Sequence, residues 1–242
     1  MKWNWRGALA TPTALALALA GCGQSAPETA PTTAASAAAP DLPPVMGAEQ
    51  RIVALGDSLF AGYGLEPGQS YPARLEAALR ARGINARIMN AGVSGDTTAG
   101  GLQRLEFTLN SLPQSPALVI ISLGGNDMLR GLPPEQTRAN LDAILGKLKQ
   151  RKIPVVLMGM IAAPNLGADY AGAFNPIYPA LATKHGAGLV PFFLQPLVDK
   201  PALVQADHIH PTASGIDLLV SETVDQVAKA LPPNPTAPPP PN

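Results

Sequence analysis

Five short apolar runs, each followed by a stretch with helical periodicity, constrain the fold of this 242-residue chain more than any other feature. The strongest run, Ala117–Leu123, is continuous and rich in β-branched residues, which is typical of a strand buried on both faces. The other expected strands are Ile52–Leu55, Arg87–Met89, Val155–Met160 and Gly188–Phe193. The expected helices are Pro72–Arg82, Gly101–Leu109, Pro134–Lys152, Asp169–His185 and Ser214–Leu231.

Strands that alternate with helices predict an α/β domain in which a five-stranded parallel sheet carries helices on both faces. Ligands of such sheets bind in a crevice at the carboxyl ends of the strands, where the winding direction switches. The residues that directly follow the strands are therefore the first candidates for a functional site.

The two ends of the chain differ from this domain in composition. Residues 23–44 hold 7 Ala and 5 Pro, and residues 232–242 hold 7 Pro, so neither segment can bury an apolar core. Basic Lys2 and Arg6 precede a short apolar stretch, as in a secretory signal peptide. We therefore expect a signal peptide at 1–21, a linker at 22–48, one folded domain at 49–231 and a Pro-rich disordered tail at 232–242.

The sequence L-A-G-C at Leu19–Cys22 resembles the lipobox of bacterial lipoproteins, in which the cysteine is lipidated and becomes the new N-terminus. Cys22 is the only cysteine of the chain, and it stands where the motif demands one. Gly23 follows it in place of an aspartate, which favours sorting to an outer membrane. The expectation is a periplasmic domain held to that membrane by lipid on Cys22; the alternative is an ordinary signal peptide.

Charge and cysteine content exclude several classes of function. The segment 49–231 carries 15 basic and 15 acidic residues without a basic run, which argues against nucleic-acid binding. A single cysteine excludes an intramolecular disulfide framework, and three histidines leave little material for a metal centre. We expect a monomer that needs no metal or cofactor.

Ser58 lies where the first expected strand passes into a helix, so its hydroxyl can point into the crevice. A lone serine there is usually a helix N-cap, and a nucleophile needs a base. In a turn, Asp207 can accept from one imidazole nitrogen of His210 while the other nitrogen faces outward. This spacing favours Ser58, His210 and Asp207 as nucleophile, base and orienting carboxylate. His208 is the weaker candidate for the base, because next to Asp207 it points to the other side of the turn.

Acyl transfer also needs hydrogen-bond donors where negative charge develops on the substrate oxygen. Gly92 has no side chain, so its amide can approach a substrate closely. Asn126 offers a neutral side-chain donor just beyond the strongest strand. Both residues therefore are candidates for an oxyanion hole; the alternative is that they are ordinary turn residues.

Four sequence blocks together resemble those of the GDSL, or SGNH, hydrolases. They read A-L-G-D-S-L, N-A-G-V-S-G-D-T, L-G-G-N-D and D-x-x-H-P, in the order of that family, and they extend over essentially all of 50–231. The resemblance implies a three-layer α/β/α, flavodoxin-like fold and ester hydrolysis through an acyl-enzyme. It also implies these roles: Ser58 as nucleophile, His210 as base, Asp207 as its orienter, and the Ser58 amide, Gly92 amide and Asn126 side chain as oxyanion hole.

Within that family the chain is most similar to the bacterial periplasmic thioesterase I, arylesterase and lysophospholipase group, through G-D-S-L-x-A-G-Y-G and L-G-G-N-D-x-L-R-G. The likeness implies aryl esters, lysophospholipids or acyl thioesters as substrates. His208 departs from the group, which often has a small residue there. We expect the apolar segments 128–132 and 161–170 to line the acyl pocket.

Two other functions compete with this interpretation. In a metallophosphoesterase, divalent metals would be held by N and O ligands drawn from Asp57, Asn126, Asp127, His208 and His210, which leaves Ser58 and Gly92 unexplained. A non-catalytic lipoprotein binding module would not need an intact Ser58, Asp207 and His210. We instead expect Asp57 and Asp127 to organise loops by hydrogen bonding, and Asp96 with Thr97 to form a turn and helix cap.

Overall fold

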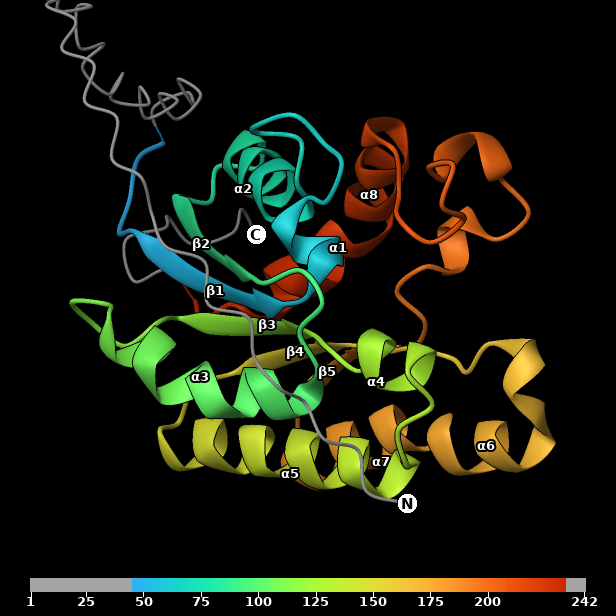
Figure 1. Cartoon of the computed structure of the whole chain (residues 1–242). Coiled ribbons are helices and arrows are strands. Elements are labelled where there is room, and N and C mark those ends of the chain that lie inside the picture. The colour runs from blue at the N-terminus through green and yellow to red at the C-terminus, as the bar shows by residue number, and fades with distance from the viewer. Residues whose placement is uncertain (1–44, 234–242) are drawn as a thin grey trace, which may run out of the picture. The chain divides into compact units, whose positions relative to one another are not determined.

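The computed structural model of the chain describes residues 45–233, in which a parallel sheet lies between two layers of helices (Figure 1). The strands are β1 (Gln50–Gly56), β2 (Ala86–Gly92), β3 (Leu118–Ser122), β4 (Val155–Met158) and β5 (Gly188–Val190). They pair in the order β2-β1-β3-β4-β5, and all four pairings are parallel. This confirms the predicted α/β fold with a five-stranded parallel sheet. The signal peptide, Cys22 with nearly all of the linker, and the tail from 234 lie outside the described residues.

Helices cover both faces of the sheet. Helices α2 and α8 pack together over one face, and α3, α5 and α7 over the other (Figure 1). The α-helices are α1 (Ser58–Ala61), α2 (Tyr71–Ala81), α3 (Thr98–Asn110), α4 (Gly125–Leu129), α5 (Pro134–Gln150), α6 (Gly167–Phe174), α7 (Ile177–His185) and α8 (Ala213–Ala230). Three 3-10 turns complete the chain: η1 (Pro164–Leu166), η2 (Gln195–Leu197) and η3 (Pro201–Leu203).

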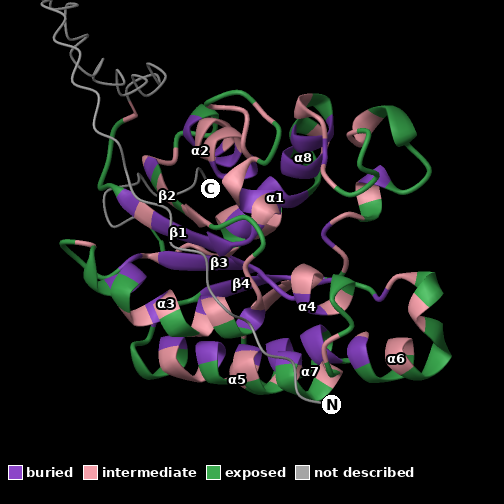
Figure 2. Ribbon diagram, in the orientation of Figure 1, coloured by how far each residue is buried: buried purple, intermediate pink, exposed green. Residues whose placement is uncertain are grey.

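The core lies between the sheet and the apolar stripes of the helices. All of β3 is buried, as expected for a central parallel strand (Figure 2). Helix α8 buries one face, with Ile216, Leu219, Val220 and Val227 at helical spacing, and leaves the opposite face exposed. Within residues 45–233, no helix combines the length and apolar character that crossing a bilayer requires.

Strands β1, β2 and β3, at whose carboxyl ends the first three family-like sequence blocks lie, end level with one another. Gly56 at the end of β1 pairs with Gly92 of β2 on one side and with Ser122 of β3 on the other. The segments that follow these strands therefore start at the same edge of the sheet. Figure 1 shows α1 and α4 at this edge, on the right of the view.

The helices and strands differ from the predicted ones where a proline ends or interrupts an element. The single helix expected over Asp169–His185 is two helices, α6 and α7, separated at Asn175 and Pro176. Pro176 lacks an N–H and restricts the residue before it, so a new helix starts after it. Strand β5 stops at Val190 because Pro191 follows.

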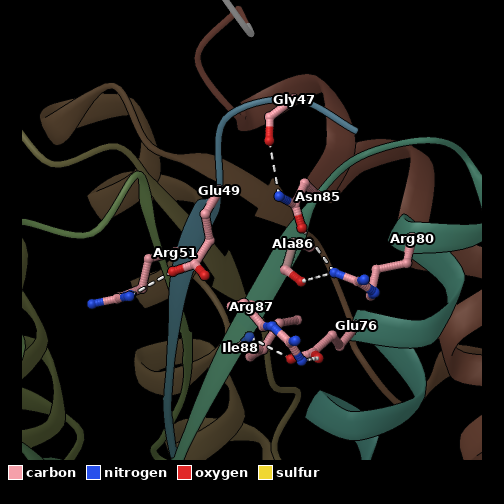
Figure 3. Close-up of polar contacts among 9 residues, drawn as sticks. All are labelled: Gly47, Glu49, Arg51, Glu76, Arg80, Asn85, Ala86, Arg87 and Ile88. Atoms are coloured by element: carbon pink, nitrogen blue, oxygen red, sulfur yellow. Dashed lines mark hydrogen bonds and ion pairs between the residues drawn. The ribbon is translucent and has the colours of Figure 1, made fainter. Parts of the chain in front are cut away.

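The outer edge of β2 is covered by side chains (Figure 3). Glu76 of α2 accepts the Ile88 N–H through Oε2 at 2.6 Å, so a backbone donor of this edge strand is paired. Arg80 donates to Asn85 Oδ1 at 2.9 Å, and Asn85 Nδ2 donates to the Gly47 carbonyl at 2.9 Å. These bonds fix the start of β2 and therefore the level at which it ends beside β1.

Candidate active site

Ser58 is the first residue of α1, directly after β1 and the connecting Asp57. The Asp57 carboxylate accepts the Leu59 N–H through Oδ1 at 3.0 Å and so caps the helix. Ser58 is therefore free of the capping role that a lone serine would be expected to fill. Its own N–H has no hydrogen-bond acceptor among residues 45–233, as is usual in the first turn of a helix.

The short helix α1 is anchored from below by Phe60. This ring is fully buried, stacks on Tyr71 with centroids 5.2 Å apart and meets Phe193 edge-on. A Cβ atom at Gly56 would lie 2.6 Å from the Phe60 ring. The glycine of the G-D-S-L block therefore lets the anchor of the serine helix pack against the strand end.

The three residues predicted as nucleophile, base and orienter lie in one hydrogen-bonded chain. Ser58 Oγ is 2.8 Å from His210 Nε2, and His210 Nδ1 is 2.6 Å from Asp207 Oδ2. Asp207 Oδ1 accepts two backbone N–H groups, those of Ile209 and His210, each at 3.0 Å. The carboxylate is therefore held by its own turn while it orients the imidazole.

The charge of Asp207 fixes the direction of these bonds. The His210 and Ile209 amides and the His210 ring lower the pKa of Asp207 to about 2. An ionised carboxylate only accepts, so His210 Nδ1 donates to it and Nε2 presents its lone pair to the Ser58 hydroxyl. This arrangement allows Nε2 to take the proton of the serine.

The loop that carries Asp207 and His210 is closed on itself before α8. Val204 and Pro211 form an antiparallel bridge, and the Gln205 N–H donates to the His210 carbonyl at 2.7 Å. The imidazole of His210 is thereby placed against Ser58, 152 residues earlier in the chain. Its side chain is only 14% exposed, so water reaches little of it.

Asn126, in the first turn of α4, presents its side chain to the turn after β2. Its Nδ2 donates to the Asp96 carbonyl at 3.0 Å, which uses one of its two amide hydrogens. The Asp96 carboxylate accepts from Arg104 Nε at 2.7 Å, and Arg104 also donates to the Gly56 carbonyl at 2.8 Å. Arg104 therefore ties the 93–97 turn to the end of β1. Arg104 is not among the residues predicted from the sequence for the site, although it stands in the S-G-D-T-T-x-x-G-L-x-R-L segment that follows β2.

The structure argues against the oxyanion role predicted for Gly92. Its N–H donates to the Asn90 side chain at 2.9 Å, and its Cα packs on α1, where an added Cβ would lie 2.3 Å from the Ala61 nitrogen. Gly92 therefore serves close packing. Gly95 differs: in the described part of the chain its N–H meets no acceptor, its φ is +81°, and it precedes the Asp96 that binds Asn126.

Asp57 and Asp127 organise loops, as predicted. Asp127 is buried and accepts the Thr98 N–H at 2.9 Å, the Thr98 hydroxyl at 2.5 Å and the Thr137 hydroxyl at 3.3 Å. Asp57 is also buried, and its burial raises its pKa to about 6. The predicted cap at Thr97 is present too, since its side chain accepts the Gly100 N–H.

The residues proposed above as metal ligands do not converge. Asp127 is turned into its own network, and His208, at a φ of +60°, lines a separate pocket with Asp199 and Lys200. Among the residues that the structure describes, no group of three or more His, Cys, Asp or Glu side chains is placed to hold a metal.

The two segments expected to line the acyl pocket lie against each other. The Ala163 N–H donates to Met128 Sδ at 3.2 Å, and the Tyr170 hydroxyl donates to the Leu132 carbonyl at 3.0 Å. Leu129 and Ile161 are roughly half exposed, at 53% and 44%. Both follow neighbouring strands, so they offer apolar surface at the same edge as Ser58.

A serine, a histidine and an aspartate joined in this way at the carboxyl edge of a parallel sheet define a serine hydrolase. Residues 54–218 match the GDSL-like lipase/acylhydrolase family. Esterase TesA of Pseudomonas aeruginosa is 42% identical over 164 residues, covering 68% of this chain and 81% of that protein. Thioesterase 1/protease 1/lysophospholipase L1 of Escherichia coli strain K12 is 37% identical over 186 residues, covering 77% and 85%.

A solved structure supports the same family. The crystal structure of AlinE4, an SGNH-hydrolase family esterase, is 62% identical and superposes with a TM-score of 0.66, covering 78% of this chain and 100% of that chain. The chain belongs to the GDSL-like lipase/acylhydrolase family, and it is a serine ester hydrolase.

Proposed function

We propose that Ser58, His210 and Asp207 hydrolyse carboxylic esters or thioesters in two steps. Ser58 Oγ attacks the carbonyl carbon while His210 Nε2 takes the hydroxyl proton, and that proton then passes to the leaving alkoxide or thiolate. The acyl group remains on Ser58 as an ester. A water molecule, deprotonated by His210, attacks this ester and releases the acid, and the proton returns to Ser58. All three residues come from one chain, so a monomer suffices.

The oxyanion hole that we propose uses three donors: the Ser58 N–H, the free hydrogen of Asn126 Nδ2 and the Gly95 N–H. The first and third lack acceptors within residues 45–233, and Asn126 Nδ2 uses only its other hydrogen, in the bond to the Asp96 carbonyl. Gly95 takes the place predicted for Gly92, whose N–H is already bonded. Removal of one such donor costs roughly 2.7–4 kcal/mol of transition-state stabilisation, so Asn126→Ala is expected to lower kcat about 100- to 1,000-fold.

The observation that carries the proposal is the chain of bonds from Ser58 to Asp207. We expect Ser58→Ala and His210→Ala each to lower turnover of p-nitrophenyl esters by several powers of ten and to leave the fold intact. Because the residues act as a unit, the double variant falls little further than either single variant. Near-normal turnover by Ser58→Ala would overturn the proposal.

Labelling gives an independent test of the nucleophile. A fluorophosphonate forms a stable bond only with an activated serine, so peptide mass spectrometry is expected to find it on Ser58 and on no other serine. His210→Ala, which lacks the base, is the matched control and is expected to label far more slowly.

For the substrates we propose acyl esters whose acyl chain lies along the 128–132 and 161–170 segments. The names of the relatives, an esterase and a thioesterase/lysophospholipase, support aryl esters, acyl thioesters and lysophospholipids. Rates on p-nitrophenyl esters from acetyl to palmitoyl, with a lysophospholipid and an acyl thioester alongside, would rank these classes.

We further propose that the enzyme works in the periplasm, anchored by lipid on Cys22 and tethered by the Ala/Pro/Thr-rich segment. The L-A-G-C sequence at Leu19–Cys22 and the place of the only cysteine support this proposal. Five prolines stand among residues 23–44, and proline-rich composition is typical of extended linkers, so it supports a tether that lets a domain act beside a bilayer without inserting. Gly23 supports sorting to the outer membrane.

A further inference from the structure

An aromatic ring packs against the imidazole of His210. Tyr63, in the loop after α1, has its ring centroid 4.5 Å from that of His210, with an angle of 35° between the planes. Tyr63 is 53% exposed, so it does not belong to the buried core. Its position is explained by the contact with His210 rather than by burial of the ring.

The backbone of Tyr63 is tied to the nucleophile. The Ser58 carbonyl accepts the N–H groups of both Gly62 and Tyr63 at 3.2 Å. Gly62 ends α1 in the left-handed region, at a φ of +85°, and turns the chain back at this point. Ser58 therefore bonds His210 through its hydroxyl, and through its carbonyl it bonds the backbone of Tyr63, whose ring contacts His210.

A second tie joins Tyr63 to the histidine loop. Gln205 Nε2 donates to the Tyr63 carbonyl at 2.8 Å and to the Pro211 carbonyl at 2.9 Å. The Gln205 N–H donates to the His210 carbonyl at 2.7 Å. Gln205 thus links the two loops, 142 residues apart, whose side chains meet in the Tyr63–His210 contact.

The contact matters because His210 becomes positively charged when it takes the Ser58 proton. The ionisable groups shown to interact with His210 in the described part of the chain are Asp207 at Nδ1, the buried Asp57 next to Ser58, and Tyr63. Asp207 meets the ring at its edge, which leaves the face of the imidazolium to Tyr63. A cation over an aromatic face is attracted by the negative face of the ring.

We propose that Tyr63 is a positioning residue for His210: its aromatic ring covers the imidazole face and stabilises the imidazolium. Gln205 holds Tyr63 in this position through the Tyr63 carbonyl. This inference rests on the proposed role of His210 as the base. The phenol hydroxyl has no part in it, and the ring face is the active element. The attraction exists only while His210 is charged, so it acts on turnover and not on substrate binding.

The experiment compares an aromatic with an aliphatic replacement. Tyr63→Phe keeps the ring and is expected to retain most of the turnover of p-nitrophenyl butyrate. Tyr63→Leu keeps apolar cover but loses the ring, and kcat is expected to fall about 3- to 30-fold, with KM within about twofold of wild type. Phe107→Leu, at a 79% exposed aromatic residue near the far end of α3, is the control and is expected to change neither constant.

Gln205→Met keeps a side chain of similar size but removes the amide that donates to the Tyr63 and Pro211 carbonyls. Like Tyr63→Leu, it is expected to lower kcat. Because both residues act through one contact, the Tyr63→Leu/Gln205→Met double variant falls less than the product of the single effects. Thermal unfolding of each variant shows whether it is folded. If Tyr63→Leu melts early, this double-variant comparison is made at a temperature where both proteins are folded.

Three outcomes would overturn the inference: full kcat in Tyr63→Leu, an equal loss in Tyr63→Phe, which would assign the effect to the hydroxyl, or a rise in KM alone, which would make Tyr63 a substrate contact. Ser58→Ala and His210→Ala, assayed alongside, separate this result from the proposed triad. If these two variants stay active, the triad fails; if they are inactive while Tyr63→Leu is unchanged, only the role of Tyr63 fails.

Discussion

At the scale of single residues, the placement of Ser58 requires a buried carboxylate beneath it. Asp57 caps α1 and so releases Ser58 from that task, but it is 2% exposed. Removal of the ionised side chain from water costs free energy, which its amide bond to Leu59 offsets only in part, and the pKa of Asp57 rises to about 6. The ionised form of this residue is therefore a source of instability beside Ser58, the proposed nucleophile.

The variant Asp57→Asn tests this cost, because asparagine caps a helix as well as aspartate does. The pKa of Asp57 is higher in the folded chain, about 6, than the ordinary 3.8, so stability falls as the pH rises between these values. We expect the variant to match wild type below about pH 4 and to be more stable by roughly 3 kcal/mol above pH 6. Urea unfolding at several pH values measures the difference, and parallel curves for the two proteins would contradict it.

The proposed role of Gly95 is tested by a pair of glycines with the same backbone shape. Gly95 and Gly83 have φ values of +81° and +78°, and an added Cβ meets no atom closer than 3.5 Å at either site. Alanine at either position is expected to cost about 1–2 kcal/mol of stability through its left-handed backbone. Only Gly95→Ala displaces a proposed oxyanion donor, so only it is expected to lower kcat, by about 10- to 100-fold. Equal kcat values in the two variants would exclude Gly95 from the oxyanion hole.

Much of the site, but not all of it, could be predicted from the sequence. Asp207 and His210 could, because their contact is made within one turn, and Ser58 could, because it follows a clear strand. The choice between Gly92 and Gly95 depends on which N–H is left unbonded. Asn90 stands two residues before Gly92, which is a known turn pattern and the one signal that its amide is occupied. The Tyr63–Gln205 bond joins distant loops, and no local pattern reports it.

At the scale of elements, the active edge depends on how α3 and α4 are joined. Asp127 of α4 accepts the Thr98 N–H at the start of α3 and the hydroxyls of Thr98 and Thr137. Asn140 of α5 donates to the Thr98 hydroxyl at 3.1 Å. One buried carboxylate therefore connects three helices and sets the position of the neighbouring Asn126.

Asp127→Ala is expected to destabilise the protein, because it leaves a buried N–H and two hydroxyls without their acceptor. Each such group costs about 1–3 kcal/mol, so for the three groups we expect a total loss of about 3 kcal/mol or more. Asp169→Ala, at an exposed aspartate in the first turn of α6, is the control and is expected to change stability by less than about 0.5 kcal/mol. Thermal and urea unfolding decide the matter; similar curves for the two variants would show that the Asp127 network contributes little.

Apolar periodicity predicted the succession of strands and long helices along the chain. It did not predict the exact boundaries of the elements or the short helices. Helices α1 and α4 have four and five residues, too few to show a period. Their positions are set by tertiary contacts, such as Phe60 on Tyr71. The break at Asn175 is stabilised by its side chain, which accepts the distant Ala162 N–H at 2.8 Å.

At the scale of the whole molecule, the folded domain and the proposed anchor have separate requirements. The domain needs the level strand ends at Gly56, Gly92 and Ser122, and these involve no residue before the first strand. The bonds that join Ser58, His210 and Asp207 are likewise made between residues of the described range 45–233. Activity is therefore expected to be independent of what happens at Cys22, and anchoring to be independent of the catalytic residues.

The variant Cys22→Ser tests this independence. Cys22→Ser is expected to yield active enzyme that is soluble after cell fractionation, while wild type sediments with membranes. Each acyl chain on the proposed lipidated Cys22 would add about 0.8 kcal/mol of membrane affinity per buried methylene, so more than one chain would hold the protein firmly. Ser58→Ala is the matched control, because it is expected to lose activity and still sediment. Mass spectrometry of the N-terminal peptide completes the test: an unmodified peptide, with wild type as soluble as Cys22→Ser, would leave only an ordinary signal peptide.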